Sequence, residues 1–355
     1  MKVLEYMERY DYEQLSVYTD RSVGLRAFIA IHDTTLGPAL GGTRIWPHPT
    51  EEDALSDVLR LARAMTYKNA AAGLNLGGGK ALIIADASKD KTETMMRAYG
   101  QFVESLGGRY VTTEDVGSTT QDMEWIAQET SHVTGLPVNQ GGSGDPSQMT
   151  GFGVYQGMKA CAKEIWGSDS LQGRVIAMQG YGKVASYLTE HLLKERVQVI
   201  VADVSPRALE RARKQGLRIV EDPQSIFDVE CDIFAPCALG GAINSKTIPR
   251  LKGKLVAGCA NNQLLEEGDA DALQKRGILY APDFIINAGG VINLSFEIDR
   301  PYDEEAAREK TARIYDTMER VIFTAKKEEI TTAKAADRLA EERINSVKKV
   351  RKIYI

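Results

Sequence analysis

The sequence has few cysteines and histidines and no excess of positive charge. Only four of each occur among the 355 residues, and no two cysteines form a CxxC pair. Such sparse thiols predict a reduced, cytoplasmic protein without a structural metal site. The 44 lysines and arginines face 49 aspartates and glutamates, which gives a net charge of −5. This balance argues against nucleic acid as a partner.

Long apolar runs are missing as well. Charges stand at close intervals among the first ten residues, where a secretion signal needs an unbroken apolar stretch. The apolar runs are short, such as 81–85, and fall far below the roughly 18 residues needed to cross a bilayer. We therefore expect a soluble protein without a membrane segment.

What the sequence does contain is an alternation of helical and strand patterns, which predicts an α/β fold with mainly parallel sheets. Thr50 and Asp53 resemble a capping box, and an apolar helical stripe then runs up to Lys68. A polar, glycine-rich stretch between Pro137 and Pro146 indicates a domain boundary. We expect two domains separated by a cleft: residues 1–145 together with the C-terminal helices of about 330–355, and residues 146–329.

The second domain shows the pattern of a dinucleotide-binding unit. Its predicted order is helix 153–166, strand 174–179, helix 184–194 and strand 197–202. A GxGxxA motif lies between the first strand and the second helix, which predicts a Rossmann-type domain that holds a pyrophosphate on the helix N-terminus. The residues expected to form this loop are Gly180, Tyr181, Gly182, Lys183 and Val184.

An acidic residue at the end of the next strand indicates which dinucleotide binds. Asp203 follows Gly180 by 23 residues, where a carboxylate can accept hydrogen bonds from the adenosine ribose. The same charge would repel a 2′-phosphate, so NAD is favoured over NADP. Arg207, four residues further on, leaves some use of NADP open.

Two lysines stand apart from ordinary surface charges. Lys80 follows the glycines 77–79 and opens the apolar strand 81–85, so its ammonium needs either a partner or a cavity. Burial and a second cation nearby would favour the neutral amine, which predicts a lysine that exchanges protons near neutral pH. Lys68, at the predicted helix end, is the candidate for that cation and suits a substrate carboxylate.

Acidic side chains follow the predicted strand 109–113. Glu114 and Asp115 stand at its carboxyl end, where α/β enzymes gather reactive groups, and Asp115 is the candidate acid. The alternative is that one of the two merely caps the next helix. Residues 37–42 read as a tight glycine-rich turn whose backbone N–H groups could face an anion.

With these residues assembled, the chain resembles the amino acid dehydrogenases of the glutamate, leucine, phenylalanine and valine dehydrogenase superfamily, most closely the leucine dehydrogenase branch. The similarity covers nearly the whole chain. The segments that carry it are 31–44, 65–70, 77–80, 114–117, 235–241, 260–263 and 282–293.

The resemblance implies reversible oxidative deamination of an L-amino acid to a 2-oxo acid and ammonia, with NAD as hydride acceptor. It implies that Lys68 and the backbone at Gly41 and Gly42 bind the substrate carboxylate. It assigns to Lys80 the activation of water and to Asp115 the transfer of protons at the substrate nitrogen. It also implies a homo-oligomer, commonly an octamer. Residues implied to contact the cofactor are Thr150 and Asn262 at its nicotinamide end, of which Asn262 also holds substrate, and Ala238.

The same resemblance gives a pocket for the substrate side chain. Glutamate-specific relatives have a lysine where this chain has Leu40, and the other implied pocket residues are Thr113, Val291 and Leu294. Thr113 and Leu294 are bulkier than the alanine and valine of the leucine dehydrogenase pattern. A mostly aliphatic wall suits leucine, valine or isoleucine. Phenylalanine dehydrogenase activity is the alternative within this reaction, and a catalytically inactive NAD-binding regulator is the alternative from another class.

Overall fold

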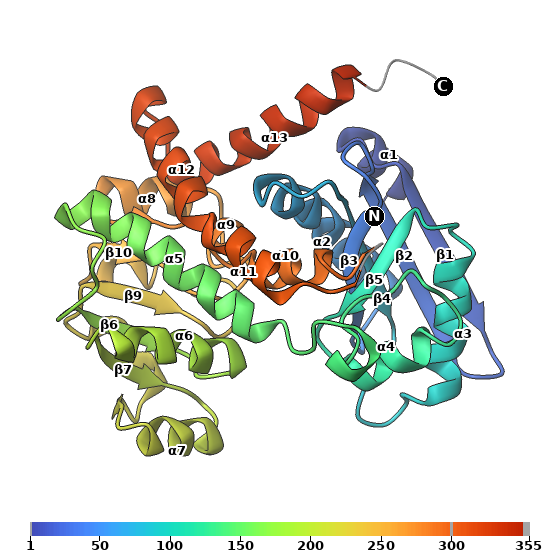
Figure 1. Cartoon of the computed structure of the whole chain (residues 1–355), viewed down its shortest axis with the longest axis horizontal. Helices are drawn as coiled ribbons and strands as arrows, with labels where there is room; N and C mark the ends of the chain where they lie inside the picture. Colours follow the sequence, from blue (N-terminus) through green and yellow to red (C-terminus); the bar gives the residue numbers. More distant parts are fainter. Residues whose placement is uncertain (1, 299–300, 351–355) are drawn as a thin grey trace. The chain divides into compact units, whose positions relative to one another are not determined.

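The computed structural model describes residues 2–298 and 301–350, which fall into two compact units (Figure 1). The first unit contains the chain up to Asp145, the segment Leu294–Glu304 and the chain from Ala340 onward. The second contains Pro146–Asn293 and Glu305–Leu339. Within the described residues, no helix combines the length and the apolar character that crossing a membrane requires.

Two segments are placed differently from the sequence-based division. Residues 294–304 belong to the first unit, because the Glu297 carboxylate accepts hydrogen bonds from the backbone N–H groups of Gly135 and Ser143, both at 2.9 Å. Residues 330–339 belong to the second unit, because the Thr332 hydroxyl donates to the Tyr280 carbonyl at 2.6 Å. These partners lie far away in sequence, so composition alone does not reveal them.

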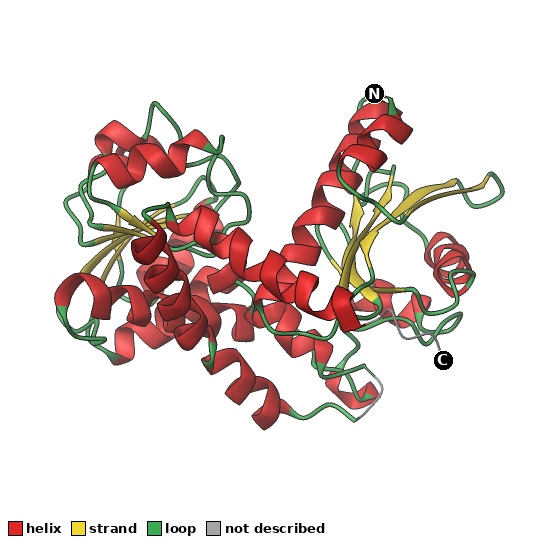
Figure 2. Cartoon of the chain, turned by 90° about the horizontal axis from the view of Figure 1, so that it is seen from above, coloured by secondary structure: helices red, strands yellow, loops and turns green. Residues whose placement is uncertain are grey.

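The first unit is built on a five-stranded mixed sheet with strand order β1-β2-β4-β3-β5. β2 is antiparallel to β1 and to β4, whereas β3 is parallel to both β4 and β5. Helices cover both faces (Figure 2). The strands are β1 (Gln14–Asp20), β2 (Leu25–Asp33), β3 (Ala39–Ile45), β4 (Gly77–Ile83) and β5 (Tyr110–Glu114); the helices are α1 (Val3–Arg9), α2 (Glu51–Ala71), α3 (Glu93–Glu104) and α4 (Thr120–Ile126), with a 3-10 turn at Val138–Gln140.

Helix α2 follows the predicted pattern closely. The Thr50 side chain caps it by accepting from the Asp53 N–H at 3.1 Å, which satisfies one of the unpaired donors at a helix start. Its apolar stripe includes Val58 and Leu59, which are buried with Phe28 and Leu82 on one face of the sheet. The helix ends at Ala71, so Lys68 lies in its last turn.

Strand β4 is longer than predicted at its N-terminal end. Gly77, Gly78 and Gly79 belong to the strand, and Lys80 lies at its middle rather than at its start. The glycines are needed because other backbone approaches closely: a Cβ on Gly78 would lie 2.1 Å from the Thr66 nitrogen of α2. Glycine in a strand interior here marks a close backbone contact and not a turn.

The second unit holds a six-stranded sheet with order β11-β10-β9-β6-β7-β8, in which all described pairs are parallel. Read from β8, this is the order 3-2-1-4-5-6 of dinucleotide-binding folds. The α/β prediction is therefore confirmed. The strands are β6 (Val175–Gln179), β7 (Gln198–Ala202), β8 (Arg218–Ile219), β9 (Ile233–Pro236), β10 (Leu255–Val256) and β11 (Leu279–Tyr280).

The helices of the second half of the chain agree with the predicted periodicity. The stripe Ile314, Met318, Val321, Ile322 and Ala325 is buried along a single helix, as predicted. The helices are α5 (Ser147–Trp166), α6 (Lys183–Lys194), α7 (Pro206–Lys214), α8 (Gly268–Lys275), α9 (Asp283–Ile286), α10 (Gly289–Ser295), α11 (Glu304–Ala312), α12 (Ile314–Glu328) and α13 (Thr332–Val350), with 3-10 turns at Pro223–Asp228 and Ile248–Arg250.

Candidate active site

Lys80 lies on the central strand of the first sheet and is only 5% exposed. Gly78, two residues before it, faces α2, and side chains two apart in a strand point to the same side. Lys80 therefore points to the face of the sheet that α2 covers. A buried ammonium on this face needs a partner of opposite charge.

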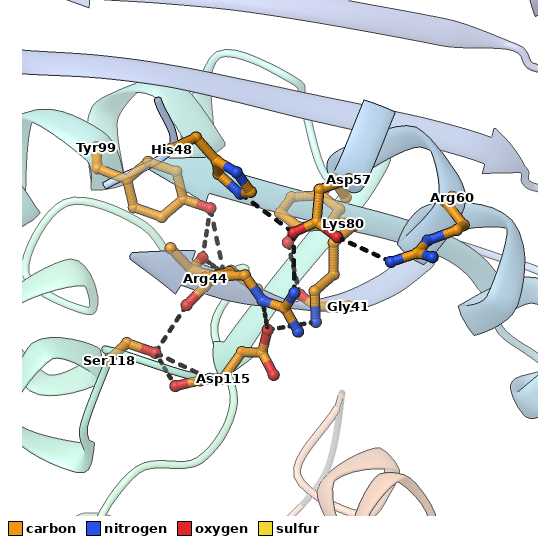
Figure 3. A network of polar contacts seen from close by, with 12 residues as sticks. Gly41, Arg44, His48, Asp57, Arg60, Lys80, Tyr99, Asp115 and Ser118 are labelled. Atoms are coloured by element: carbon orange, nitrogen blue, oxygen red, sulfur yellow. Dashed lines mark hydrogen bonds and ion pairs between the residues drawn. The ribbon is translucent and has the colours of Figure 1, made fainter. Parts of the chain in front are cut away.

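The partner is Asp115, the residue that follows β5. The Lys80 Nζ lies 2.8 Å from the Asp115 Oδ2, and the Arg44 Nε lies 3.2 Å from the same oxygen (Figure 3). The Asp115 backbone is held in turn, since its N–H donates to the Ser118 Oγ at 2.9 Å. Three neighbouring strands thus bring two cations to one carboxylate: Lys80 from the middle of β4, Arg44 from near the end of β3, and Asp115 just after β5.

The surroundings of Asp115 decide its charge. Burial alone would raise the pKa of this carboxyl, but the charges of Lys80 and Arg44 outweigh burial and hold the pKa below its ordinary value. Asp115 is therefore a carboxylate at neutral pH. The alternative that Glu114 or Asp115 caps the next helix is wrong, because Thr119 and Asp122 form the cap of α4.

Lys68 lies in the last turn of α2, the helix that covers the Lys80 face. Asn69 beside it is buried, and its side-chain amide donates to the Gly77 carbonyl at 2.6 Å. This hydrogen bond joins the C-terminal end of α2 to β4. The backbone position of Lys68 is therefore fixed by α2, in which it lies, and by β4, to which its neighbour Asn69 bonds. The role of Lys68 as a carboxylate ligand stays a prediction.

Gly41 and Gly42 do not form the predicted turn. Both lie in β3, where a Cβ on Gly41 would stand 1.8 Å from the Gly79 carbonyl oxygen and one on Gly42 would stand 2.5 Å from the Glu114 carbonyl oxygen. The glycines permit three strands to pack closely. Glycine is used both for such close packing and for tight turns, so the sequence alone does not distinguish the two. Gly42 pairs with Thr113 of β5.

The residues predicted to contact the substrate side chain lie in both units. Leu40 and Gly42 on β3 and Thr113 on β5 share the face of Lys80, as the strand register and the alternation of side chains require. A Cβ on Gly135 would approach the Thr113 Oγ1 at 3.0 Å and the Leu294 Cδ2 at 3.6 Å, so Thr113 and Leu294 lie near one point. Val291 is buried in α10.

Thr113 has one feature that the sequence did not predict. Its Oγ1 is buried, and within the described residues no hydrogen-bond partner reaches it. A buried hydroxyl without a partner costs about 1–3 kcal/mol. The predicted pocket wall is therefore not purely aliphatic, although Leu40 and Leu294 are both buried apolar residues.

In the second unit the glycine motif has the geometry of a phosphate-binding turn. Gly180 has a φ of +92°, and a Cβ there would lie 2.8 Å from the Ala238 nitrogen. Gly182 is the N-cap of α6, and a Cβ there would meet nothing within 4 Å. The helix N-terminus thus has an open approach for a pyrophosphate, with Ala238 beside the turn, so these residues fit a dinucleotide.

Asp203 follows β7 and bonds to the glycine turn. Its Oδ2 accepts from the Tyr181 N–H at 2.6 Å and its Oδ1 accepts from the Ser205 N–H at 2.7 Å. Each carboxylate oxygen can accept a second hydrogen bond, so ribose hydroxyls can share it. Asp203 also supports the turn, a role that sequence spacing did not indicate.

Thr150 and Asn262 each lie at a constrained position in the second unit. The Thr150 hydroxyl donates to the Pro146 carbonyl at 2.9 Å in the first turn of α5. Asn262 has a φ of +51°, and its carbonyl accepts from the Gly241 N–H at 2.8 Å. The cofactor contacts predicted for Thr150, Ala238 and Asn262 stay predictions.

The sequence analysis missed Arg44 and Asp57. The Arg44 Nη1 lies 2.8 Å from the Asp57 Oδ2, so this arginine bridges two carboxylates. A signal existed, because Arg44, like Lys80, stands in a strand of mostly glycine and apolar residues, and the argument that a cation in such a strand needs a partner applies to both.

Comparison with known proteins places these features in a family. Residues 13–132 match the model of the Glu/Leu/Phe/Val dehydrogenase dimerisation domain, and residues 141–206 and 204–352 match the Glutamate/Leucine/Phenylalanine/Valine dehydrogenase model. A leucine dehydrogenase of Geobacillus stearothermophilus is 55% identical over 355 residues, which cover 100% of this chain and 96% of that relative.

Two further relatives have other named substrates. A valine dehydrogenase of Streptomyces virginiae is 47% identical over 340 residues, 95% of each chain. The crystal structure of L-tryptophan dehydrogenase from Nostoc punctiforme superposes with a TM-score of 0.83 at 46% identity and covers 98% of this chain and 99% of that one. By the extent of these matches and by its fold, the chain belongs to the glutamate, leucine, phenylalanine and valine dehydrogenase family.

Proposed function

We propose that the protein catalyses the reversible NAD-dependent oxidative deamination of branched-chain aliphatic L-amino acids to 2-oxo acids and ammonia. The observation that carries this proposal is the contact of the buried Lys80 ammonium with the Asp115 carboxylate at 2.8 Å. The reaction needs a group that moves protons at the substrate nitrogen and another that activates water. This pair supplies both on a face shared with Leu40 and Thr113.

The proposed steps assign one task to each side chain. Lys68 holds the substrate carboxylate by charge. Asp115 accepts a proton from the substrate ammonium, which leaves a neutral amine. The glycine turn of the second unit would hold NAD, which would supply a hydride acceptor for the α-carbon, and the substrate would become an iminium. Lys80, once its ammonium proton has passed to solvent, removes a proton from the water that attacks the iminium carbon, which gives a carbinolamine. Asp115 returns its proton to the nitrogen, the C–N bond breaks as the carbonyl forms, and the departing ammonia takes up the hydroxyl proton and leaves as ammonium.

The proposed substrate range rests on the side chains near the pocket. Leu40 offers no charge to a distal carboxylate, which disfavours glutamate. Thr113 and Leu294 add bulk, which favours aliphatic over aromatic side chains. Relatives named leucine dehydrogenase and valine dehydrogenase support this preference. Phenylalanine is the second candidate, since a relative of closely similar fold is named L-tryptophan dehydrogenase.

The direct test follows NADH formation at alkaline pH with valine, leucine, isoleucine, 2-aminobutyrate, phenylalanine and glutamate, with NADP as a parallel cofactor. We expect the three branched substrates to have the highest kcat/KM, within about 200-fold of one another, since one methylene changes the preference by about 10- to 200-fold. If phenylalanine leads, the steric argument from Thr113 and Leu294 is wrong. No turnover with any amino acid would favour the inactive NAD-binding regulator.

Replacement of Asp203 by alanine is expected to weaken NAD binding about tenfold and to raise the NADP-to-NAD ratio of kcat/KM. The carboxylate accepts from ribose hydroxyls and repels a 2′-phosphate. Asp222→Ala is the matched control, because Asp222 accepts from the Gln224 N–H in the same unit but lies outside the glycine turn. An unchanged NADP-to-NAD ratio would exclude Asp203 as the ribose ligand.

We also propose that copies of this chain associate. The match of residues 13–132 to a model described as a dimerisation domain supports association. Closed symmetric assemblies are the usual result for a chain of this kind. The number of copies predicted from the resemblance is eight, and light scattering of the purified protein measures it.

A further inference from the structure

Arg44 is a cation beside the proposed site to which the proposed steps assign no task. It stands near the end of β3, and its side chain is 23% exposed. Its Nε contacts the Asp115 Oδ2 at 3.2 Å while its Nη1 contacts the Asp57 Oδ2 at 2.8 Å. The guanidinium therefore spans two carboxylates, and Figure 3 shows it between them.

Asp57 fixes the far end of this arginine. It projects from α2, its side chain is 11% exposed, and it also lies 3.3 Å from the His48 Nε2 and 3.5 Å from an Arg60 nitrogen. Arg60 is largely exposed, so it is screened by water and contributes little. Asp57 thus anchors Arg44 on the helix that covers the sheet.

The charged groups that contact Asp115 are Lys80 from β4 and Arg44 from β3. These two differ in one respect that matters for proton transfer. A lysine can release its proton when a site requires it, whereas an arginine remains charged at every pH at which a protein is folded. Whenever Lys80 is neutral in the proposed reaction, Arg44 is the remaining cation in contact with Asp115.

We propose that Arg44, anchored by Asp57, is a positioning residue that fixes the Asp115 side chain in place and favours its ionised form, so that Asp115 returns to a carboxylate after each proton transfer whether or not Lys80 is charged. The inference rests on the proposed function, in which Asp115 and Lys80 both transfer protons. It places a permanent positive charge beside Lys80 and Asp115. Asp57 holds this charge in place, and no ion pair of Asp57 with Lys80 is seen among the described residues.

The test measures kcat and KM against pH for Arg44→Gln and Arg44→Lys. The glutamine variant is expected to lose tenfold or more in kcat with KM changed less than about threefold. The acidic limb of its kcat–pH profile is expected to move to a higher pH by about one unit, because removal of an opposite charge raises the pKa of a carboxyl. The lysine variant keeps a charge and is expected to restore the limb to its original pH.

Arg97→Met is the matched control for loss of an ion pair. The Arg97 Nε donates to Glu129 at 2.6 Å in the same unit, away from Asp115. If Arg44→Gln moves the limb no more than Arg97→Met does, Arg44 is only a structural residue and the inference is overturned. If Arg44→Gln does not fold, Asp57→Asn carries the test, since it releases the anchor but leaves the contact with Asp115. It is expected to lower kcat with a smaller shift of the limb, and an unchanged kcat overturns the inference.

Failure of the inference is separable from failure of the proposed function. If the wild type is active and the acidic limb of the kcat–pH profile does not move in Arg44→Gln, only the role of Arg44 is contradicted. A wild type that deaminates no amino acid contradicts the function. In that case the Asp115 carboxyl is titrated by NMR in protein carrying 13C-labelled aspartate, with Asp115→Asn for assignment, and an unshifted midpoint in Arg44→Gln overturns the inference.

Discussion

Lys80→Ala is expected to lower kcat by about 100- to 10,000-fold, the range for loss of a general acid or base. Affinity for NAD should change less than about threefold. The Lys80 ammonium contacts Asp115 in the first unit. Gly180 and Asp203, which are predicted to bind the dinucleotide, lie in the second unit. Steady-state kinetics with leucine and a separate titration of NAD by fluorescence measure the two effects.

Two companion variants sharpen this result. Lys89→Ala removes an exposed lysine that pairs with Asp86 at 2.9 Å, and it should leave kcat unchanged. Lys80→Arg keeps the positive charge beside Asp115 but cannot release a proton, so it should be nearly as inactive as the alanine variant. An active arginine variant would show that Lys80 acts by charge alone.

Gly78→Ala is expected to destabilise the protein by about 3 kcal/mol or more, at or above the usual range for overpacked cores. The added Cβ would lie 2.1 Å from both the nitrogen and the Oγ1 of Thr66. The side-chain oxygen can rotate away, but the nitrogen belongs to the α2 backbone, so the helix itself would have to shift from the sheet. Thermal unfolding by circular dichroism and the yield of folded protein measure the effect.

The matched control is Gly268→Ala. Gly268 begins α8, and a Cβ there would meet nothing within 4 Å. Alanine is the better helix former, so this variant should be as stable as the wild type or slightly more stable. Equal stability of the two variants would mean that α2 yields easily, and the role given to the glycines of β4 would then be wrong.

Much of the fold could be predicted because it depends on local patterns. The order of β6, α6 and β7 follows from alternating periodicity, and the glycines and Asp203 stand at fixed positions relative to those elements. The strand status of Gly77–Gly79 could not be predicted, since glycine has low strand propensity and only the approach of Thr66 requires it there. The strand conformation of residues 77–79 therefore depends on tertiary packing and not on local propensity.

The site divides in the same way. Lys80 and Asp115 could be predicted as candidates because a buried cation and a carboxylate at a strand end are visible in the sequence. Their partnership could not, since 35 positions separate them. Arg44 lies 71 positions from Asp115 and 13 from Asp57, and no periodicity connects such distances. Long-range pairs of this kind become known only when the strand order is known.

Glu297 has a consequence for the recombination of related genes. Its carboxylate accepts from the N–H groups of Gly135, Leu136 and Ser143 and from the Ser143 hydroxyl. The segment from Leu294 to Glu304 is thereby bound to the chain before Asp145. A chimera that exchanges the second unit between family members should take this short segment from the parent that supplies residues 135–143. The crossovers then lie after Asp145, before Leu294, after Glu304 and after Leu339. A single crossover between Ser143 and Glu297 separates the carboxylate from its four donors.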